Sequence, residues 1–158
     1  QMIVQRLART PWAYSKPRHG AVERYPARSL DGHLAVIIDE HAGSDGDIFP
    51  ESFRILELGP LIGTRTWGGV VGIRMDKPFV DAGVSSQPEF AWWEPKRGWS
   101  LENEGVTPDI VLPITPTDYV QGRDPQLART IELLLQKLEN DPKNPPEAPP
   151  YPDRVDGN

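Results

Sequence analysis

The chain has 158 residues, no cysteine, 37% hydrophobic residues and a formal net charge of -6. This length suits one domain with a core of ordinary size, and the lack of cysteine excludes disulfides, thiolate catalysis and Cys-based zinc sites. The acidic balance argues against nucleic-acid binding, and no apolar run approaches the roughly 20 residues of a membrane span. A cysteine-free composition is compatible with a reducing compartment.

The first residues predict a helix over 2–9, which ends before Pro11 because a residue that precedes proline avoids helical dihedral angles. The sequence opens within this helical pattern, so we expect it to be a fragment of a longer chain. Residues 11–32 contain three prolines and few aliphatic side chains, which predicts a long loop or extended arm. The continuous apolar run 34–38 is typical of a strand buried on both faces of a mainly parallel sheet.

The middle of the chain predicts a strand, a tight turn and a helix in succession. Residues 41–47 form the turn, and the apolar residues of 48–58 recur at a roughly helical spacing. This helix is expected to end near Gly59. A short strand is predicted over 61–64, followed by a glycine-rich stretch at 67–73.

Short β-like segments fill much of the next fifty residues. Residues 78–80 and 84–86 flank a turn and indicate a hairpin, and further strands are predicted at 89–93 and 110–112.

The clearest helix is the last one. Asp124 can cap it, Pro125 fits its first position, and it is expected to end near Asn140. Five apolar residues form one stripe along this helix: Leu127, Ile131, Leu134, Leu135 and Leu138.

This order of elements predicts an α/β core with antiparallel additions. We assign residues 1–141 to one domain. Residues 142–158 carry six prolines between Pro142 and Pro152, which predicts a solvated tail without a packed element.

Ser44 is a candidate nucleophile because it lies where the buried strand passes into the helix, between Gly43 and Asp45. Small neighbours allow a sharp turn, and the first N–H groups of a helix have no acceptor inside the helix. The N–H of Asp45 is the first donor available to an oxyanion, and the helix dipole favours negative charge there. The local pattern leaves open the alternative that Ser44 or Asp45 only caps the helix.

A serine nucleophile needs a base, and the sequence offers three histidines, His19, His33 and His41. None has a context that marks it as a base. Their spacing also predicts no metal site.

The block 39–49, DEHAGSDGDIF, resembles the nucleophile region of the tricorn proteases, which are serine peptidases related to the C-terminal (tail-specific) processing peptidases. The resemblance covers roughly residues 1–141 and continues through four further segments: 61–73, 87–91, 101–109 and 118–126. It implies a partial domain with the layered β-sheet and helices of the crotonase/tail-specific peptidase type.

The same resemblance implies a Ser-His-Ser-Glu tetrad. Ser44 matches the nucleophile and Glu102, in the motif LENEGV, matches the acid that acts on the histidine through a second serine. Asp45 supplies an oxyanion N–H. The histidine, the helper serine and a second oxyanion donor, a glycine, are expected upstream of residue 1, so we expect the chain alone to be inactive.

Candidate substrate-binding residues follow from the glycine-rich stretch and from the family. An exposed edge at Gly72 and Ile73 can pair with an extended peptide. Ile48 lies one turn beyond Ser44 and fits either a specificity pocket or the core. Ser15 stands where some tricorn proteases have an acidic residue that favours basic residues before the cut, so that preference is in question here.

Taken together, the sequence predicts the nucleophile-bearing part of a cytoplasmic, homo-oligomeric serine peptidase of endopeptidase or carboxypeptidase-like type. Its partners are peptide substrates and upstream domains of the same polypeptide, with no metal and no cofactor. Two alternatives are a non-catalytic peptide- or ligand-binding module of the same fold and a crotonase-like acyl-CoA enzyme.

Overall fold

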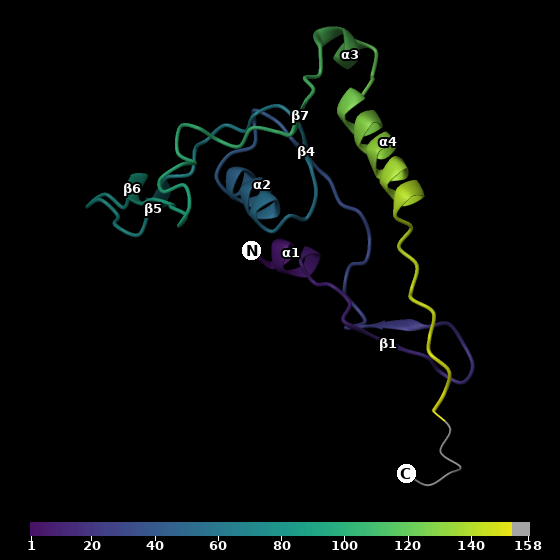
Figure 1. Cartoon of the computed structure of the whole chain (residues 1–158). Coiled ribbons are helices and arrows are strands. Elements are labelled where there is room, and N and C mark those ends of the chain that lie inside the picture. The colour runs from purple at the N-terminus through teal and green to yellow at the C-terminus, as the bar shows by residue number, and fades with distance from the viewer. Residues whose placement is uncertain (153–158) are drawn as a thin grey trace.

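The computed structural model of the chain describes residues 1–152. Its centre is a three-stranded parallel sheet with the order β3-β4-β7, formed by Val36–Ile38, Leu61–Gly63 and Ile110–Val111 (Figure 1). The helix α2 (Asp45–Ile55) connects the parallel strands β3 and β4. The predicted α/β class and the strand-turn-helix-strand order are therefore confirmed.

Two helices cover this sheet. Phe53 of α2 packs with Ile38, Leu61 and Val106 in one buried cluster. The helix α4 (Pro125–Asn140) contacts β3 and β4, and Figure 1 shows α2 and α4 on either side of the strands. All three residues of the middle strand β4 are buried, as expected for a strand covered on both faces.

The prediction that the run 34–38 is buried on both faces is wrong for the edge strand β3. Ile38 is buried, but the Ile37 side chain is 40% exposed. β3 lies at the edge of the sheet, with a neighbouring strand, β4, on one side.

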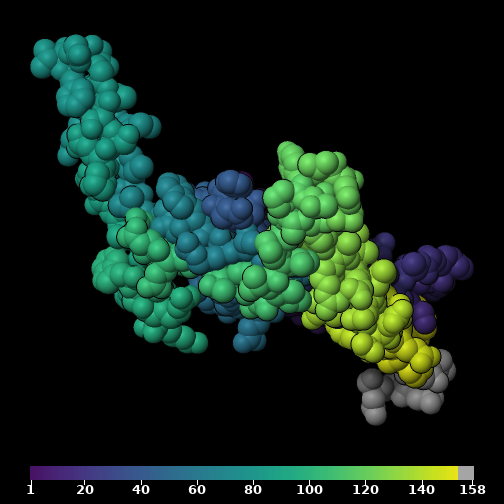
Figure 2. Space-filling view, turned by 90° about the horizontal axis from the view of Figure 1, so that it is seen from above, coloured from purple at the N-terminus to yellow at the C-terminus, as the bar shows by residue number. Residues whose placement is uncertain are grey.

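Two antiparallel pairs lie outside the central sheet. β1 (Ala13–Ser15) pairs with β2 (Glu23–Tyr25) inside the segment predicted as a loop. β5 (Gly72–Arg74) pairs with β6 (Gln87–Phe90), and their connection projects from the body of the molecule as the teal segment in Figure 2. The predicted hairpin turn at 81–83 is present. The strands that pair, however, are β5 and β6, which lie further from the turn than the predicted strands 78–80 and 84–86.

The bounds of the other helices differ from the predicted ones by a few residues. α1 (Met2–Leu7) ends two residues before the predicted boundary, and α2 begins at Asp45 rather than at 48. α3 (Pro116–Val120) was not predicted, although Thr115 and Asp118 form a capping box there.

The helix α4 has the predicted bounds, and the Asp124 side chain accepts a hydrogen bond from the Leu127 N–H at 2.8 Å. Its apolar stripe, however, does not face the sheet. The buried residues are Gln126 and Thr130, and Gln126 Nε2 donates to the Leu112 carbonyl oxygen at 2.8 Å. Four residues of the stripe are exposed in this chain: Leu127, Ile131, Leu135 and Leu138.

Residues 142–152 adopt neither helix nor strand, and residues 153–158 of the predicted tail lie outside the described residues. Within residues 1–152, no helix combines the length and the apolar character needed to cross a membrane.

The buried middle strand generates a stability prediction. Leu61→Ala should lower the free energy of unfolding by about 2–5 kcal/mol, because Leu61 is fully buried in the cluster with Phe53. Leu138→Ala, at a 44% exposed position of α4, is the matched control and should cost less than about 1 kcal/mol. Urea unfolding followed by circular dichroism measures both, and equal losses would contradict the assignment of the core.

Candidate active site

Ser44 occupies the N-cap position of α2 with φ 56 and ψ -115, a left-handed conformation that is uncommon outside glycine. Its side chain makes no capping hydrogen bond with the helix, and the residue is exposed. The alternative that the Ser44 hydroxyl caps the helix therefore does not hold. Strained residues of this kind gather at functional sites.

The turn that carries Ser44 is hydrogen bonded to residues 67–71, which we call the glycine loop. The Ser44 N–H donates to the Gly69 carbonyl oxygen at 2.9 Å, and the Trp67 N–H donates to the Ala42 carbonyl oxygen at 2.8 Å. A Cβ at Gly43 or Gly69 would lie 2.5 or 2.7 Å from Cε3 of Trp67. Both glycines are therefore required for the indole ring to lie against the nucleophile turn.

Two carboxyl groups hold the glycine loop. Glu102 Oε2 accepts the N–H groups of Val70 and Val71 at 2.8 and 2.7 Å. Asp47 Oδ1 accepts the Gly68 N–H at 2.8 Å, and Asp47 is fully buried. Sequence reasoning did not select Asp47; the available signal was a second acidic residue in the first turn of α2.

A solvent-open pocket joins most of the predicted site residues. Five of the predicted residues line it: Ser44, Asp45, Ile48, Gly72 and Ile73. Glu102 does not line the pocket itself but accepts hydrogen bonds from two residues that do, Val70 and Val71. The lining consists of Ser44, Asp45, Ile48, Val70, Val71, Gly72, Ile73, Phe90 and Trp92. Because Asp45 begins α2, its N–H has no acceptor within the helix and lies next to Ser44.

Ser15 is not part of this group. It lies in β1 and lines a separate pocket with residues of the tail, among them Glu147 and Pro149.

The strand β5 forms one wall of the pocket, and the Ile73 side chain is 55% exposed. The Phe90 ring packs directly on Gly72, since a Cβ there would lie 2.3 Å from ring atoms of Phe90. Gly72 therefore permits contact with Phe90, and the exposed Ile73 is the better placed of the two for contact with another chain.

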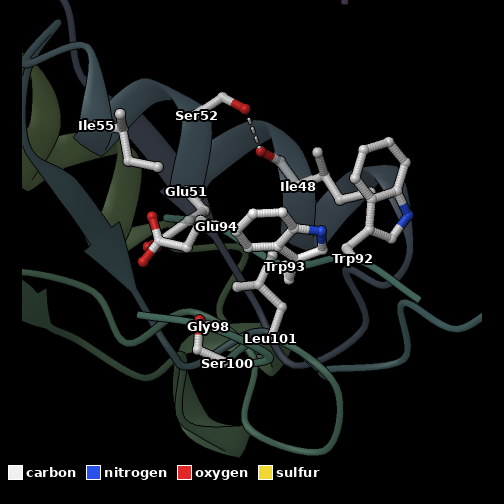
Figure 3. A pocket seen from close by; sticks show the side chains of 10 residues that line it. All are labelled: Ile48, Glu51, Ser52, Ile55, Trp92, Trp93, Glu94, Gly98, Ser100 and Leu101. Atoms are coloured by element: carbon white, nitrogen blue, oxygen red, sulfur yellow. Dashed lines mark hydrogen bonds between the residues drawn. The ribbon is translucent and has the colours of Figure 1, made fainter. Parts of the chain in front are cut away.

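Ile48 and Trp92 also line a second, mostly apolar pocket of about 120 Å³ on the neighbouring face of α2 (Figure 3). The size is close to that of a cavity that holds a benzene-sized group. Ile48 is half-buried and does not belong to the central cluster, which favours the pocket alternative over the core alternative.

None of the three histidines lines the pocket at Ser44. His41 lies in another pocket with Glu40 and Thr64, at the carboxyl ends of β3 and β4. There the Thr64 hydroxyl donates to Glu40 and, with a backbone N–H, lowers the pKa of the Glu40 carboxyl. His33 Nε2 lies 2.9 Å from the Asp141 carbonyl oxygen.

Residues 1–152 therefore place no imidazole at the candidate nucleophile. In the same residues no group of three or more His, Asp or Glu side chains is arranged to hold a metal ion.

Comparison with known proteins defines the class of protein to which this site belongs. The model of peptidase family S41 matches residues 2–112, so the chain belongs to peptidase family S41. Among its relatives is the tricorn protease of Thermoplasma volcanium, 50% identical over 139 residues, which cover 88% of this chain and 14% of that protein. Tricorn protease homolog 1 of Streptomyces coelicolor is 41% identical over 150 residues, 94% of this chain and 14% of that protein.

Solved structures agree with this assignment. The crystal structure of the tricorn protease matches with a TM-score of 0.84 and 46% identity, over 89% of this chain and 14% of that one. The structure of mature CPAF complexed with lactacystin matches with a TM-score of 0.62 and 26% identity, over 74% of this chain and 23% of that one. The predicted family and fold type are confirmed, and the chain spans about one seventh of the length of its curated relatives.

The contact between Gly43 and Trp67 predicts how sensitive the nucleophile turn is. In the full-length protein, Gly43→Ala should lower the rate at which a fluorophosphonate modifies Ser44 by at least about 10-fold, because the new Cβ displaces the ring or the turn. Gly32→Ala is the control, since a Cβ there meets no atom within 4 Å. Mass spectrometry of the labelled peptide gives both rates, and equal rates would show that the ring does not constrain the turn.

Proposed function

We propose that this chain carries the nucleophile and part of the substrate cleft of a longer serine peptidase that hydrolyses peptides. The observation that carries the proposal is the exposed Ser44 in a strained conformation at the N-terminus of α2. Membership of peptidase family S41 supports it.

In the proposed reaction, Ser44 Oγ attacks the carbonyl carbon of a peptide bond and its proton passes to a histidine. The Asp45 N–H donates to the oxyanion, and the positive end of the α2 dipole adds to its stabilisation. Collapse of the intermediate breaks the C–N bond, and the amine leaves with the proton from the histidine. Water, activated by the same histidine, then hydrolyses the acyl-enzyme and regenerates Ser44. No step requires a metal ion or cofactor.

We propose that the histidine, the helper serine and the glycine donor come from other parts of the longer polypeptide. Two observations support this: the pocket at Ser44 contains no histidine of residues 1–152, and the relatives are about seven times longer than this chain. Glu102 then orients the histidine through the helper serine. Its Oε2 is engaged by Val70 and Val71, which leaves Oε1 for that hydroxyl.

The substrate side of the proposal uses β5 and α2. An extended peptide would pair along the backbone at Gly72 and Ile73, and Ile48 would line the pocket for the side chain next to the cut bond. Ser15 offers no charge for a basic side chain. We further propose, on the resemblance to tricorn proteases, that residues 1–141 form the catalytic subdomain of a cytoplasmic homo-oligomer and that residues 142–158 form a solvated tail.

Ser44→Ala in the full-length protein should abolish cleavage of fluorogenic peptides and fluorophosphonate labelling, with the fold unchanged. Ser29→Ala is the matched control, because the Ser29 hydroxyl donates to the Pro26 carbonyl oxygen at 2.8 Å and Ser29 does not line the pocket at Ser44. Labelling at another serine would remove Ser44 from the reaction. Binding of peptides without cleavage by the wild type would favour a binding module, and binding of CoA an acyl-CoA enzyme.

Glu102→Gln should lower kcat by about 100-fold or more with little change in KM, by analogy with the loss of an orienting carboxylate in serine triads. The glutamine side-chain oxygen still accepts the N–H groups of Val70 and Val71, so the glycine loop keeps its place. Steady-state kinetics of the full-length variant measure both constants. A kcat equal to that of the wild type would exclude Glu102 from the active site.

A further inference from the structure

Asp47 is a fully buried acidic residue for which the proposed reaction has no use. It lies in the first turn of α2, three residues after Ser44, with 0% of its surface exposed. Burial of a carboxyl group is costly unless it is hydrogen bonded. Its Oδ1 atom accepts one hydrogen bond, from the Gly68 N–H at 2.8 Å.

Gly68 cannot easily move away from this contact. Its φ is +86, and a Cβ there would lie 2.6 Å from the Gly105 nitrogen, so only glycine fits. The Gly68 carbonyl oxygen accepts the Asn103 N–H at 2.7 Å. Gly68 is therefore held from both sides, with its N–H bonded to α2 and its carbonyl oxygen bonded to the turn that contains Glu102.

The next residue of the glycine loop makes the contact with the nucleophile. The Gly69 carbonyl oxygen accepts the Ser44 N–H, and Ser44 has the strained φ of 56. A strained conformation persists only where neighbouring contacts determine it. Asp47 is therefore connected to Ser44 in two ways: by the backbone at the start of α2, and by the hydrogen bonds that Gly68 and Gly69 make with Asp47 and Ser44.

We propose that Asp47 is a positioning residue for Ser44. Its hydrogen bond to Gly68 fixes the glycine loop against α2, the helix that follows Ser44. The Gly69 carbonyl oxygen is then in place to hold the Ser44 backbone in its left-handed conformation. Glu102 holds the other end of the same loop at Val70 and Val71. This inference rests on the proposed function in that Ser44 is taken as the nucleophile.

The test compares three variants of the full-length protein. Asp47→Ala removes the acceptor, and Asp47→Asn keeps an oxygen in the position of Oδ1. Thr66→Val is the matched control. Thr66 is also fully buried and its hydroxyl accepts one backbone N–H, from Val106 at 2.7 Å, but it does not contact Gly68 or Gly69 through this bond.

Two readouts separate positioning from general stability. The first is the rate of fluorophosphonate modification of Ser44, together with kcat and KM for a peptide. The second is hydrogen exchange of the amides in residues 67–71, which does not depend on activity. For Asp47→Ala we expect labelling and kcat to fall about 100-fold with KM nearly unchanged, and exchange in the glycine loop to become faster. Asp47→Asn should restore both to within about 5-fold of wild type, and Thr66→Val should leave labelling within about 3-fold.

Two results would overturn the proposal: unchanged exchange of the glycine loop in Asp47→Ala, or an equal loss of labelling in Asp47→Ala and Thr66→Val. If wild-type Ser44 fails to react at all, the proposed peptidase function fails. The exchange data then still decide whether Asp47 holds the loop: faster exchange in Asp47→Ala alone supports the contact, and unchanged exchange refutes it.

Discussion

The hydrogen bond from the Ser44 N–H to the Gly69 carbonyl oxygen is the contact on which the candidate site depends. Together with the bonds from the Trp67 N–H to the Ala42 carbonyl oxygen and from the Gly68 N–H to Asp47, it joins the turn after β3 to the glycine loop after β4. Because Ser44 has a left-handed backbone, it needs such an external contact to stay in place. As the N-cap residue, Ser44 lies beside the first N–H groups of α2, and it lines the pocket bordered by β5.

The fold explains why these segments meet. In a β-α-β unit the parallel strands end at the same edge of the sheet, and the turns that follow them lie side by side. Here β3 leads into the nucleophile turn and β4 leads into the glycine loop, with α2 as the crossover. The buried middle strand β4 anchors this arrangement, and the Glu102 turn closes over the loop from the other side.

The sequence predicted those features that depend on local patterns. Asp124 and Pro125 define the start of α4, and the apolar runs identify β3 and β4. Local patterns do not record tertiary contacts. α4 buries Gln126, which bonds to Leu112, and leaves most of its apolar stripe exposed, while the hairpin β1–β2 forms in a segment without an apolar alternation.

The residues of the candidate site also divide into those that local sequence patterns indicate and those that only tertiary contacts reveal. The small-residue turn before a helix made Ser44 and Asp45 candidates but fitted a helix cap as well, and Glu102 was a candidate only from resemblance to a family. Asp47 could not be selected, because an acidic residue in the first turn of a helix is common and its burial becomes visible only when Gly68 is placed against it. Ser15 shows the reverse case: its position in a motif gave it a role, whereas β1 places it away from the pocket at Ser44.

We propose that this chain supplies a nucleophile whose base lies elsewhere in a longer polypeptide. The most direct measurement is the second-order rate of fluorophosphonate modification of Ser44 in residues 1–158 alone and after addition of the separately produced remainder of the protein. We predict negligible modification and no peptide turnover for residues 1–158 alone, and recovery of both on mixing. Rapid, Ser44-dependent turnover by residues 1–158 alone would contradict this proposal and would make His19, His33 or His41 the base.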